Sequence, residues 1–285
     1  ELSVDGFSSG NGVHLIDGVL HYVGSLSGGV PAAISLNFNL DKLGVVSRFS
    51  FSGVGQVTGV FEERGVLNFV GGSDSQGSGS DFTIWRLDGS VTRIVDSDNS
   101  QIFAVNPNGR AVGIVNQVNQ GFVSYLDNGG DSLNILPGIA GYFLGGQAIT
   151  EDSQFIGGSG FDADNNFRVV TYKLTNGSYQ IYRDSYRTRG GFDTFSMKFV
   201  ESPNGVFVLA SYYDANFTQK VAMFTIDGEE VVADVGDGYV TGAVSIGGNI
   251  YIATSGGTVT AISSTFDKRT STIDELFGST GFSLD

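Results

Sequence analysis

The chain contains no cysteine, only four prolines and no long apolar run. The absence of cysteine excludes disulfides and thiolate zinc sites, and two histidines, His14 and His21, are too few to favour any other zinc site. So few prolines disfavour a proline-rich linker. No stretch of 18 consecutive apolar residues exists, so the sequence predicts no membrane-spanning helix.

Basic residues are also scarce. Only 16% of the residues are charged, and 30 acidic residues against 15 basic ones give a net charge of −15. Such a surface repels the phosphates of nucleic acids and anionic lipids. The charge therefore disfavours a nucleic-acid partner and is compatible with cation binding, with a basic partner, or with an ordinary soluble surface.

Glycine, by contrast, is abundant, with 43 residues, and phenylalanine and tyrosine number 22 and 11. Polar positions are filled by Ser, Asn, Thr and Gly rather than by Lys and Glu. These residues favour strands and tight turns and are poor helix formers. The composition predicts an all-β protein.

A turn signal followed by a short apolar strand recurs six times along the chain. The second residues of these turns are Gly18, Gly65, Gly109, Ser153, Gly205 and Gly248. Successive gaps are 47, 44, 44, 52 and 43 residues, so six similar units fill nearly the whole chain. Each unit continues with an apolar strand that ends in a second turn, such as FTIWRLDG at 82–89 or VAMFTIDG at 221–228, and with a further short strand. In the sixth unit these two strands are expected at 258–267 (TVTAISSTFD) and 271–276 (STIDEL).

Four short strands per repeat of this length are typical of a β-propeller blade. The sequence therefore predicts one domain over 1–285, a six-bladed β-propeller of four-stranded antiparallel blades. The predicted blades are 10–49, 50–97, 98–138, 139–184, 185–236 and 237–277. The two ends, 1–7 and 281–285, are expected to close the ring or to pair with a neighbour. A two-sheet sandwich, a jelly roll and a β-helix are the alternative folds, but they explain the six equal units less well.

The third and fourth units resemble the HAF-type extracellular repeat of bacterial secreted β-propellers. The resemblance is carried by FAVNPNGRAVG (103–113) with GFVSYLDNG (121–129), and by QAITEDSQFIGG (147–158) with FRVVTYKLTNG (167–177). The other units match this repeat only in spacing. The resemblance implies a propeller and an extracellular location, and it implies no catalytic residue.

A cluster of arginines and tyrosines between the fourth and fifth units is a candidate ligand site. It comprises Tyr182, Arg183, Tyr186, Arg187 and Arg189. Guanidinium groups bind carboxylate or sulfate through paired hydrogen bonds, and tyrosine rings stack on sugars or other planar groups. The alternative is that these arginines pair with carboxylates of the protein itself.

The loop FDADNNF at 161–167 is a candidate Ca²⁺ site. Asp162, Asp164 and Asn165 offer three oxygen-bearing side chains within one tight loop, as a hard cation prefers. The loop lacks the glycine and the distal glutamate of an EF-hand, and a solvated hairpin turn accounts for the same residues. The loop therefore has two interpretations, a site for a Ca²⁺ cofactor and a solvated hairpin turn without a metal ion.

No catalytic constellation stands out, so the first functional hypothesis is a non-enzymatic extracellular binding or structural module. An adhesin, a surface-layer or filament component and a virion appendage belong to this class. Its partner would be a protein or glycan surface, or further copies of the chain, at the cell surface or on a virion. The alternative is a propeller hydrolase, either glycoside-cleaving or a Ca²⁺-dependent lactonase-like enzyme, with acidic residues at the central channel.

Overall fold

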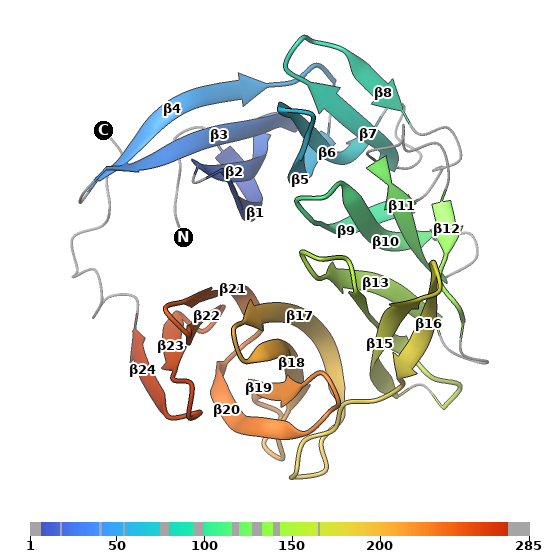
Figure 1. Cartoon of the computed structure of the whole chain (residues 1–285), viewed down its shortest axis with the longest axis vertical. Helices are drawn as coiled ribbons and strands as arrows, with labels where there is room; N and C mark the ends of the chain where they lie inside the picture. Colours follow the sequence, from blue (N-terminus) through green and yellow to red (C-terminus); the bar gives the residue numbers. More distant parts are fainter. Residues whose placement is uncertain are drawn as a thin grey trace. The chain divides into compact units, whose positions relative to one another are not determined.

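The computed structural model describes residues 7–17, 19–39, 42–53, 55–74, 80–93, 100–115, 120–126, 133–138, 143–164 and 166–272. The regular elements of this part of the chain are strands, without a helix (Figure 1). They form six four-stranded antiparallel blades, which confirms the predicted six-bladed β-propeller. The chain divides into two compact units, with blades one to three in unit 1 and blades four to six in unit 2.

Unit 1 contains the first twelve strands. They are β1 (Phe7–Ile16), β2 (Val19–Leu26), β3 (Val30–Asn39), β4 (Lys42–Ser50), β5 (Gly55–Glu63), β6 (Val66–Asp74), β7 (Ser80–Arg86), β8 (Val91–Arg93), β9 (Ser100–Val105), β10 (Arg110–Val115), β11 (Gln120–Tyr125) and β12 (Leu133–Ile135).

Unit 2 contains the remaining strands. They are β13 (Phe143–Ile149), β14 (Phe155–Phe161), β15 (Phe167–Thr175), β16 (Ser178–Arg183), β17 (Thr194–Ser202), β18 (Gly205–Tyr213), β19 (Gln219–Thr225), β20 (Glu230–Asp237), β21 (Val240–Ile246), β22 (Asn249–Thr254), β23 (Thr258–Ile262) and β24 (Lys268–Thr272).

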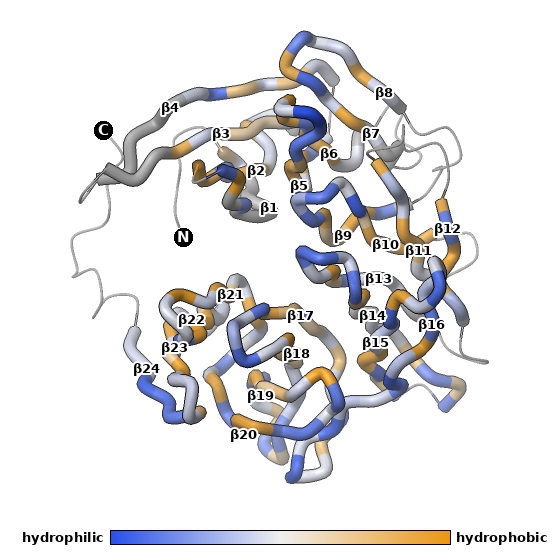
Figure 2. Tube along the Cα trace, in the orientation of Figure 1, coloured by the Kyte–Doolittle hydropathy of each residue, from blue (hydrophilic) through white to orange (hydrophobic). Residues whose placement is uncertain are grey.

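The recurring turn signals lie where the chain reverses between the first and second strands of a blade. Gly65, Ser153 and Gly205 have φ angles of 79°, 61° and 122°, in the range that glycine tolerates and most other residues avoid. The turns are hydrophilic and the strands carry recurring apolar residues (Figure 2). This alternation explains why the turn spacing in the sequence predicts the blades.

The pairing of the first and second strands is irregular in each blade. In blade three the register shifts between Val112 and Gly113, and in blade two it shifts between Val57 and Gly59. A β-carbon at Gly113 would overlap the carbonyl oxygen of Gln101, which the bulge pushes toward it. Glycine in the second strand therefore accommodates a bulge in the adjacent strand.

Apolar side chains of neighbouring blades pack against one another within unit 1. One buried cluster joins blades one and two and includes Val23, Phe69 and Trp85. A second cluster joins blades two and three and includes Phe61 and Phe122. Burial of each such side chain contributes about 1.5–3 kcal/mol, so the contacts between blades stabilise this unit.

Unit 2 has the same construction. A cluster with Met197 and Phe224 joins blades four and five, and another with Leu209 and Ile252 joins blades five and six. Met197 packs so closely on β14 that a side chain at Gly157 would overlap its thioether. Small residues in the second strands thus also make room for the next blade.

Two strand predictions for the last blades need correction. The last strand was expected at 271–276, whereas β24 spans Lys268–Thr272 and pairs with β23. The third strand was expected to run to 267, whereas β23 ends at Ile262 because a turn follows, in which Phe266 takes a φ of 65° in place of a glycine. The predicted boundary of blade five at residue 185 lies in the connection that precedes β17, which begins at Thr194. Segments 1–6 and 281–285, predicted to close the ring, lie outside the described residues.

Candidate functional site

The predicted arginine and tyrosine cluster spans the end of β16 and the connection to β17, and it contacts the β19–β20 turn. The Arg183 guanidinium donates to the carbonyl oxygens of Ser185 (2.8 Å) and Asp227 (2.6 Å). The buried Tyr186 donates its hydroxyl to the Ile226 carbonyl (2.7 Å), and burial raises its pKa. These two residues therefore hold blade five through backbone groups of one turn.

Tyr182 and Arg189 make further hydrogen bonds to the same part of blade five. The Tyr182 hydroxyl donates to the Asp227 carboxylate, and this hydrogen bond raises the pKa of the tyrosine. The backbone N–H of Arg189 donates to the buried Glu230 carboxylate (2.6 Å), and its guanidinium donates to the Glu230 carbonyl (2.8 Å). Tyr182, Arg183 and Arg189 thus contact groups of the protein itself, but the two guanidinium groups bind backbone carbonyls and not the carboxylates of the alternative interpretation.

Arg187 differs because its side chain is 63% exposed. Its Nε lies 2.7 Å from the Gly191 carbonyl oxygen and 3.4 Å from Oδ1 of Asp193. Asp193 also pairs with Arg168, at 3.2 Å. Arg187 is therefore an accessible member of the predicted cluster, and a ligand-binding role for the cluster stays a prediction.

The predicted calcium loop is a hairpin turn organised by Asp162. Oδ1 of Asp162 accepts the backbone N–H groups of Asp164 (3.0 Å) and Asn166 (2.9 Å). Oδ2 accepts from the Arg168 guanidinium at 2.9 Å. These hydrogen bonds, led by that of the Asn166 N–H, lower the pKa of Asp162.

The other two predicted ligands do not complete a site in the described part of the chain. Asp164 is exposed at the tip of the turn, and Asn165 lies outside the described residues. Among the described residues no group of three or more His, Cys, Asp or Glu side chains is close enough to hold a metal ion. Calcium binding here remains a prediction.

Four aromatic rings form a continuous row along the same ends of blades four and five. Ring centroids are separated by 4.4 Å for Phe161 and Phe167, 5.4 Å for Phe167 and Phe195, and 4.9 Å for Phe195 and Tyr213. Phe167 and Tyr213 remain 40% and 46% exposed. We call Phe161, Phe167, Phe195 and Tyr213 the aromatic row.

The aromatic row brings together the two segments that the sequence singled out. Phe161 and Phe167 flank the turn of Asp162, while Asp193 precedes Phe195 by two residues. The ion pairs of Asp193 with Arg168 and Arg187 run beside the row. Sequence reasoning missed the row because its members lie at the ends of four different strands, β14, β15, β17 and β18.

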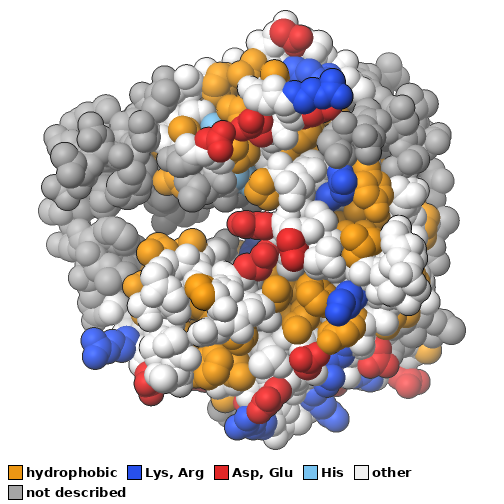
Figure 3. All heavy atoms as spheres, in the orientation of Figure 1, with side chains coloured by type: hydrophobic (Ala, Val, Ile, Leu, Met, Phe, Trp, Pro, Cys, Tyr) orange, Lys and Arg blue, Asp and Glu red, His pale blue; other side chains and the backbone are white. Residues whose placement is uncertain are grey.

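Phe217 follows the aromatic row in the β18–β19 turn and is 87% exposed. Its φ of 59° is in the left-handed region, which a bulky residue rarely adopts. On the face drawn in Figure 3, hydrophobic side chains reach the surface among scattered charges. A ring this exposed on a strained backbone is nevertheless unusual.

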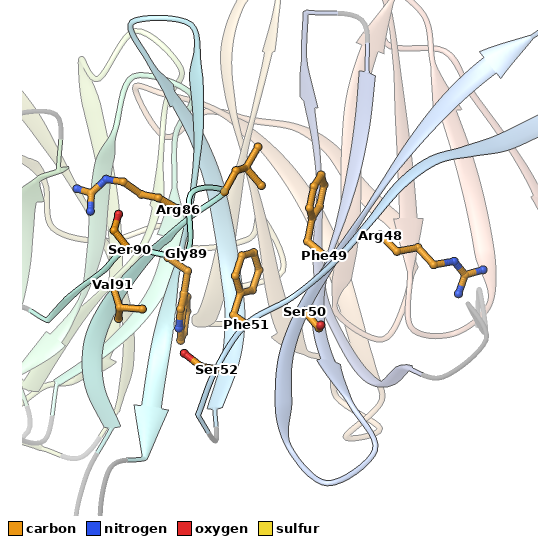
Figure 4. Close-up of a pocket in the computed structure, with 11 residues that line it drawn as sticks. Arg48, Phe49, Ser50, Phe51, Ser52, Arg86, Gly89, Ser90 and Val91 are labelled. Atoms are coloured by element: carbon orange, nitrogen blue, oxygen red, sulfur yellow. The ribbon is translucent and has the colours of Figure 1, made fainter.

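Unit 1 carries an open pocket of about 460 Å³ between the end of β4 and the β7–β8 hairpin (Figure 4). Phe49, Phe51 and Trp85 form its apolar wall, and Phe51 stacks on Trp85 with ring centroids 5.8 Å apart. Arg48 and Arg86 lie at opposite ends, as Figure 4 shows. We call this site the aromatic pocket.

A cavity of about 480 Å³ lies in unit 2 beneath the β16–β17 connection. Phe192 stacks on Tyr212 at 5.9 Å in its wall, and Glu230 closes one side. Tyr212 donates its hydroxyl to the Ala233 carbonyl (2.9 Å). The polar groups of this cavity thus make hydrogen bonds within the protein that stabilise the fold.

No protein-family model and no curated protein matches the sequence. Solved structures match the fold at low identity. A protein from Lactobacillus plantarum is 14% identical, with a TM-score of 0.58 over 92% of this chain and 84% of that one. A candidate 6-phosphogluconolactonase from Bacteroides uniformis is 11% identical (TM-score 0.53, 91% and 83% covered), and a candidate TolB from Agrobacterium tumefaciens is 16% identical (TM-score 0.53, 81% and 82% covered). At these identities the similarity shows the propeller fold alone.

Proposed function

We propose that this chain is a non-enzymatic binding or structural module of an extracellular or cell-surface assembly, such as an adhesin, a surface-layer or filament component, or a virion appendage. The aromatic row carries the proposal. Exposed rings in contact with one another supply large apolar area at low conformational cost, and aromatic residues dominate the energetics of protein interfaces. The partner is a protein or glycan surface.

Two further observations support this function. The repeats at 103–129 and 147–177 resemble HAF-type extracellular repeats, and we infer membership of that class. The net charge of −15 disfavours nucleic acid. Within the part of the chain that the structure describes, no helix has the length and apolar character needed to cross a bilayer.

The proposal is tested by substitution of two exposed rings of the aromatic row, Phe167→Ser with Tyr213→Ser. Labelled wild-type protein is applied to an immobilised polysaccharide panel and to purified bacterial cell envelopes. We expect the double variant to lose the binding that the wild type shows. A matched control, Tyr239→Ser, removes another ring that is 52% exposed and should bind as the wild type does.

Two results would contradict this function. The first is a wild-type protein that stays strictly monomeric and binds no surface of either kind. The second is turnover of a lactone or glycoside substrate by the purified protein, which would instead support the alternative of a propeller hydrolase.

A further inference from the structure

Phe217 occupies a turn position that takes glycine elsewhere in this protein. Five turns share one pattern, in which the first residue pairs with the fifth through the backbone, its side-chain oxygen accepts the N–H of the fifth, and the fourth residue is left-handed. The left-handed residues are Gly109, Gly191, Phe217, Gly228 and Phe266, with φ angles of 69°, 86°, 59°, 85° and 65°. The fold therefore accepts glycine here and does not itself require phenylalanine.

The two phenylalanines differ in what their rings contact. Phe266 packs on Phe207, with ring centroids 5.7 Å apart, and joins the buried cluster of blades five and six. Phe217 is 87% exposed and has no aromatic neighbour among the described residues. Its strained backbone is thus not offset by packing within the chain, as expected of a side chain retained to contact something else.

The aromatic pocket of unit 1 has the chemistry to receive such a ring. Its accessible wall consists of the partly buried Phe49 and Phe51, the buried Trp85 stacks against Phe51, and the rim includes the exposed apolar side chains of Leu87 and Val91. A ring that enters can stack on Phe51 or meet the rings edge-on, the arrangements that aromatic pairs prefer. At about 460 Å³ the pocket admits a phenylalanine side chain.

The charges around the two features are complementary. Asp214 begins the turn that carries Phe217, and its Oδ1 accepts the backbone N–H groups of Asn216 (2.8 Å) and Thr218 (2.9 Å). The described residues that line the aromatic pocket include Arg48 and Arg86 and no carboxylate. The chain has only 15 basic residues and a net charge of −15, so a pocket with two arginines is an uncommon positive site on its surface. Electrostatic attraction therefore favours binding of the turn that carries Asp214 and Phe217 at this pocket.

We propose that this protein associates with itself head to tail, with Phe217 of one copy inserted into the aromatic pocket of the next. The inference rests on the proposed structural role and specifies the partner as a second copy of this chain. The two surfaces in the contact are different, so each copy keeps one Phe217 and one pocket for further neighbours. Such contacts extend into a filament or close into a ring.

The test uses two variants that each disable one side of the contact. Phe217→Gly removes the ring and leaves a residue that suits the left-handed turn. Ser52→Trp fills the pocket from an exposed position on its rim. Sedimentation is measured over a wide concentration range in about 0.15 M NaCl, where a screening length of about 8 Å suppresses the long-range repulsion between acidic copies.

We expect wild-type protein to form species larger than dimers as its concentration rises. Each variant alone should raise the dissociation constant of self-association by about tenfold or more, the loss typical of a buried aromatic anchor. An equimolar mixture should form dimers and nothing larger, because only the ring of the Ser52→Trp chain and the pocket of the Phe217→Gly chain remain functional. Tyr239→Ser serves as the matched control and should assemble like the wild type.

The outcomes separate this contact from the broader function. A wild type that remains monomeric overturns self-association, and the binding role then depends on the test of the aromatic row. Assembly that neither variant weakens overturns this contact and leaves the structural role standing. Binding of a glycan or another protein that depends on Phe217, without self-association, also overturns the proposal.

Discussion

Replacement of Phe217 by glycine should stabilise the protein, and the same replacement at Phe266 should destabilise it. The two positions share the same turn geometry, with φ angles of 59° and 65°, and both lie in unit 2. They differ in burial, because Phe217 is 87% exposed whereas Phe266 packs on Phe207 and the adjoining cluster. The pair therefore separates backbone strain from side-chain packing.

The magnitudes follow from three effects. Relief of the left-handed conformation contributes about 1–2 kcal/mol at each position. The additional freedom of glycine in the unfolded chain offsets about 0.4–1 kcal/mol of this gain. Phe217 loses little else, so Phe217→Gly should raise the free energy of unfolding by about 0.5–1 kcal/mol. Phe266 also loses a partly buried ring, which costs about 2–3 kcal/mol, so Phe266→Gly should lower it by about 1–2 kcal/mol.

Guanidinium unfolding followed by far-UV circular dichroism measures both changes, since a shift in midpoint at constant slope reports stability. The comparison should use dilute protein, so that self-association does not contribute. A lower midpoint for Phe217→Gly than for wild type would refute the assignment of strain to this turn. Equal effects at the two positions would refute the role given to ring packing at Phe266.

Four further outcomes are expected. Gly113→Ala should destabilise the protein by about 1–3 kcal/mol in chemical unfolding, because its methyl group overlaps the Gln101 carbonyl oxygen; an unchanged midpoint would contradict the bulge argument. Hydrogen bonds lower the pKa of Asp162 below its ordinary value of 3.8. The stabilisation by its carboxylate is therefore present above pH 3.8 and is lost as the pH falls through the lowered pKa. The difference in the free energy of unfolding between wild type and Asp162→Asn should narrow over that pH range. Burial lowers the pKa of His21 from 6.5, so stability should fall as pH drops below 6.5, and His21→Asn should flatten that dependence in a pH series of melting curves. If Ca²⁺ binds the 161–167 loop, it should raise the melting temperature and Asp164→Asn should remove most of that gain; identical curves in Ca²⁺ and EDTA would leave an ordinary hairpin turn.

Much of the fold could be predicted because local turn chemistry repeats along the chain. Turn residues such as Gly65 and Gly205 mark the reversals that define each blade, and their spacing is visible without any long-range information. The strand ends of the last blade were predicted less accurately, because its third strand ends in a turn with Phe266 at the left-handed position. A phenylalanine there gives no turn signal in the sequence.

The candidate sites could be predicted only in part, since their chemistry depends on contacts far apart in sequence. Arg183 was recognised as a candidate ligand residue, but its contact with the carbonyl of Asp227 follows from the packing of blade four on blade five. The row of Phe167, Phe195 and Tyr213 likewise depends on strand ends that meet in space. Phe217 could have been found by comparing the turns with one another, since glycine occupies the same position in three of them.

The central claim, that exposed aromatic side chains form the contact surface of a binding or structural module, is tested most directly by hydroxyl-radical footprinting. Side-chain oxidation is measured for wild-type protein as a dilute monomer and in its associated form, whether self-assembled or bound to a surface. The account predicts that Phe217, Tyr213 and Phe167 are oxidised in the monomer and protected on association. Equal oxidation of these three side chains in both states would contradict it.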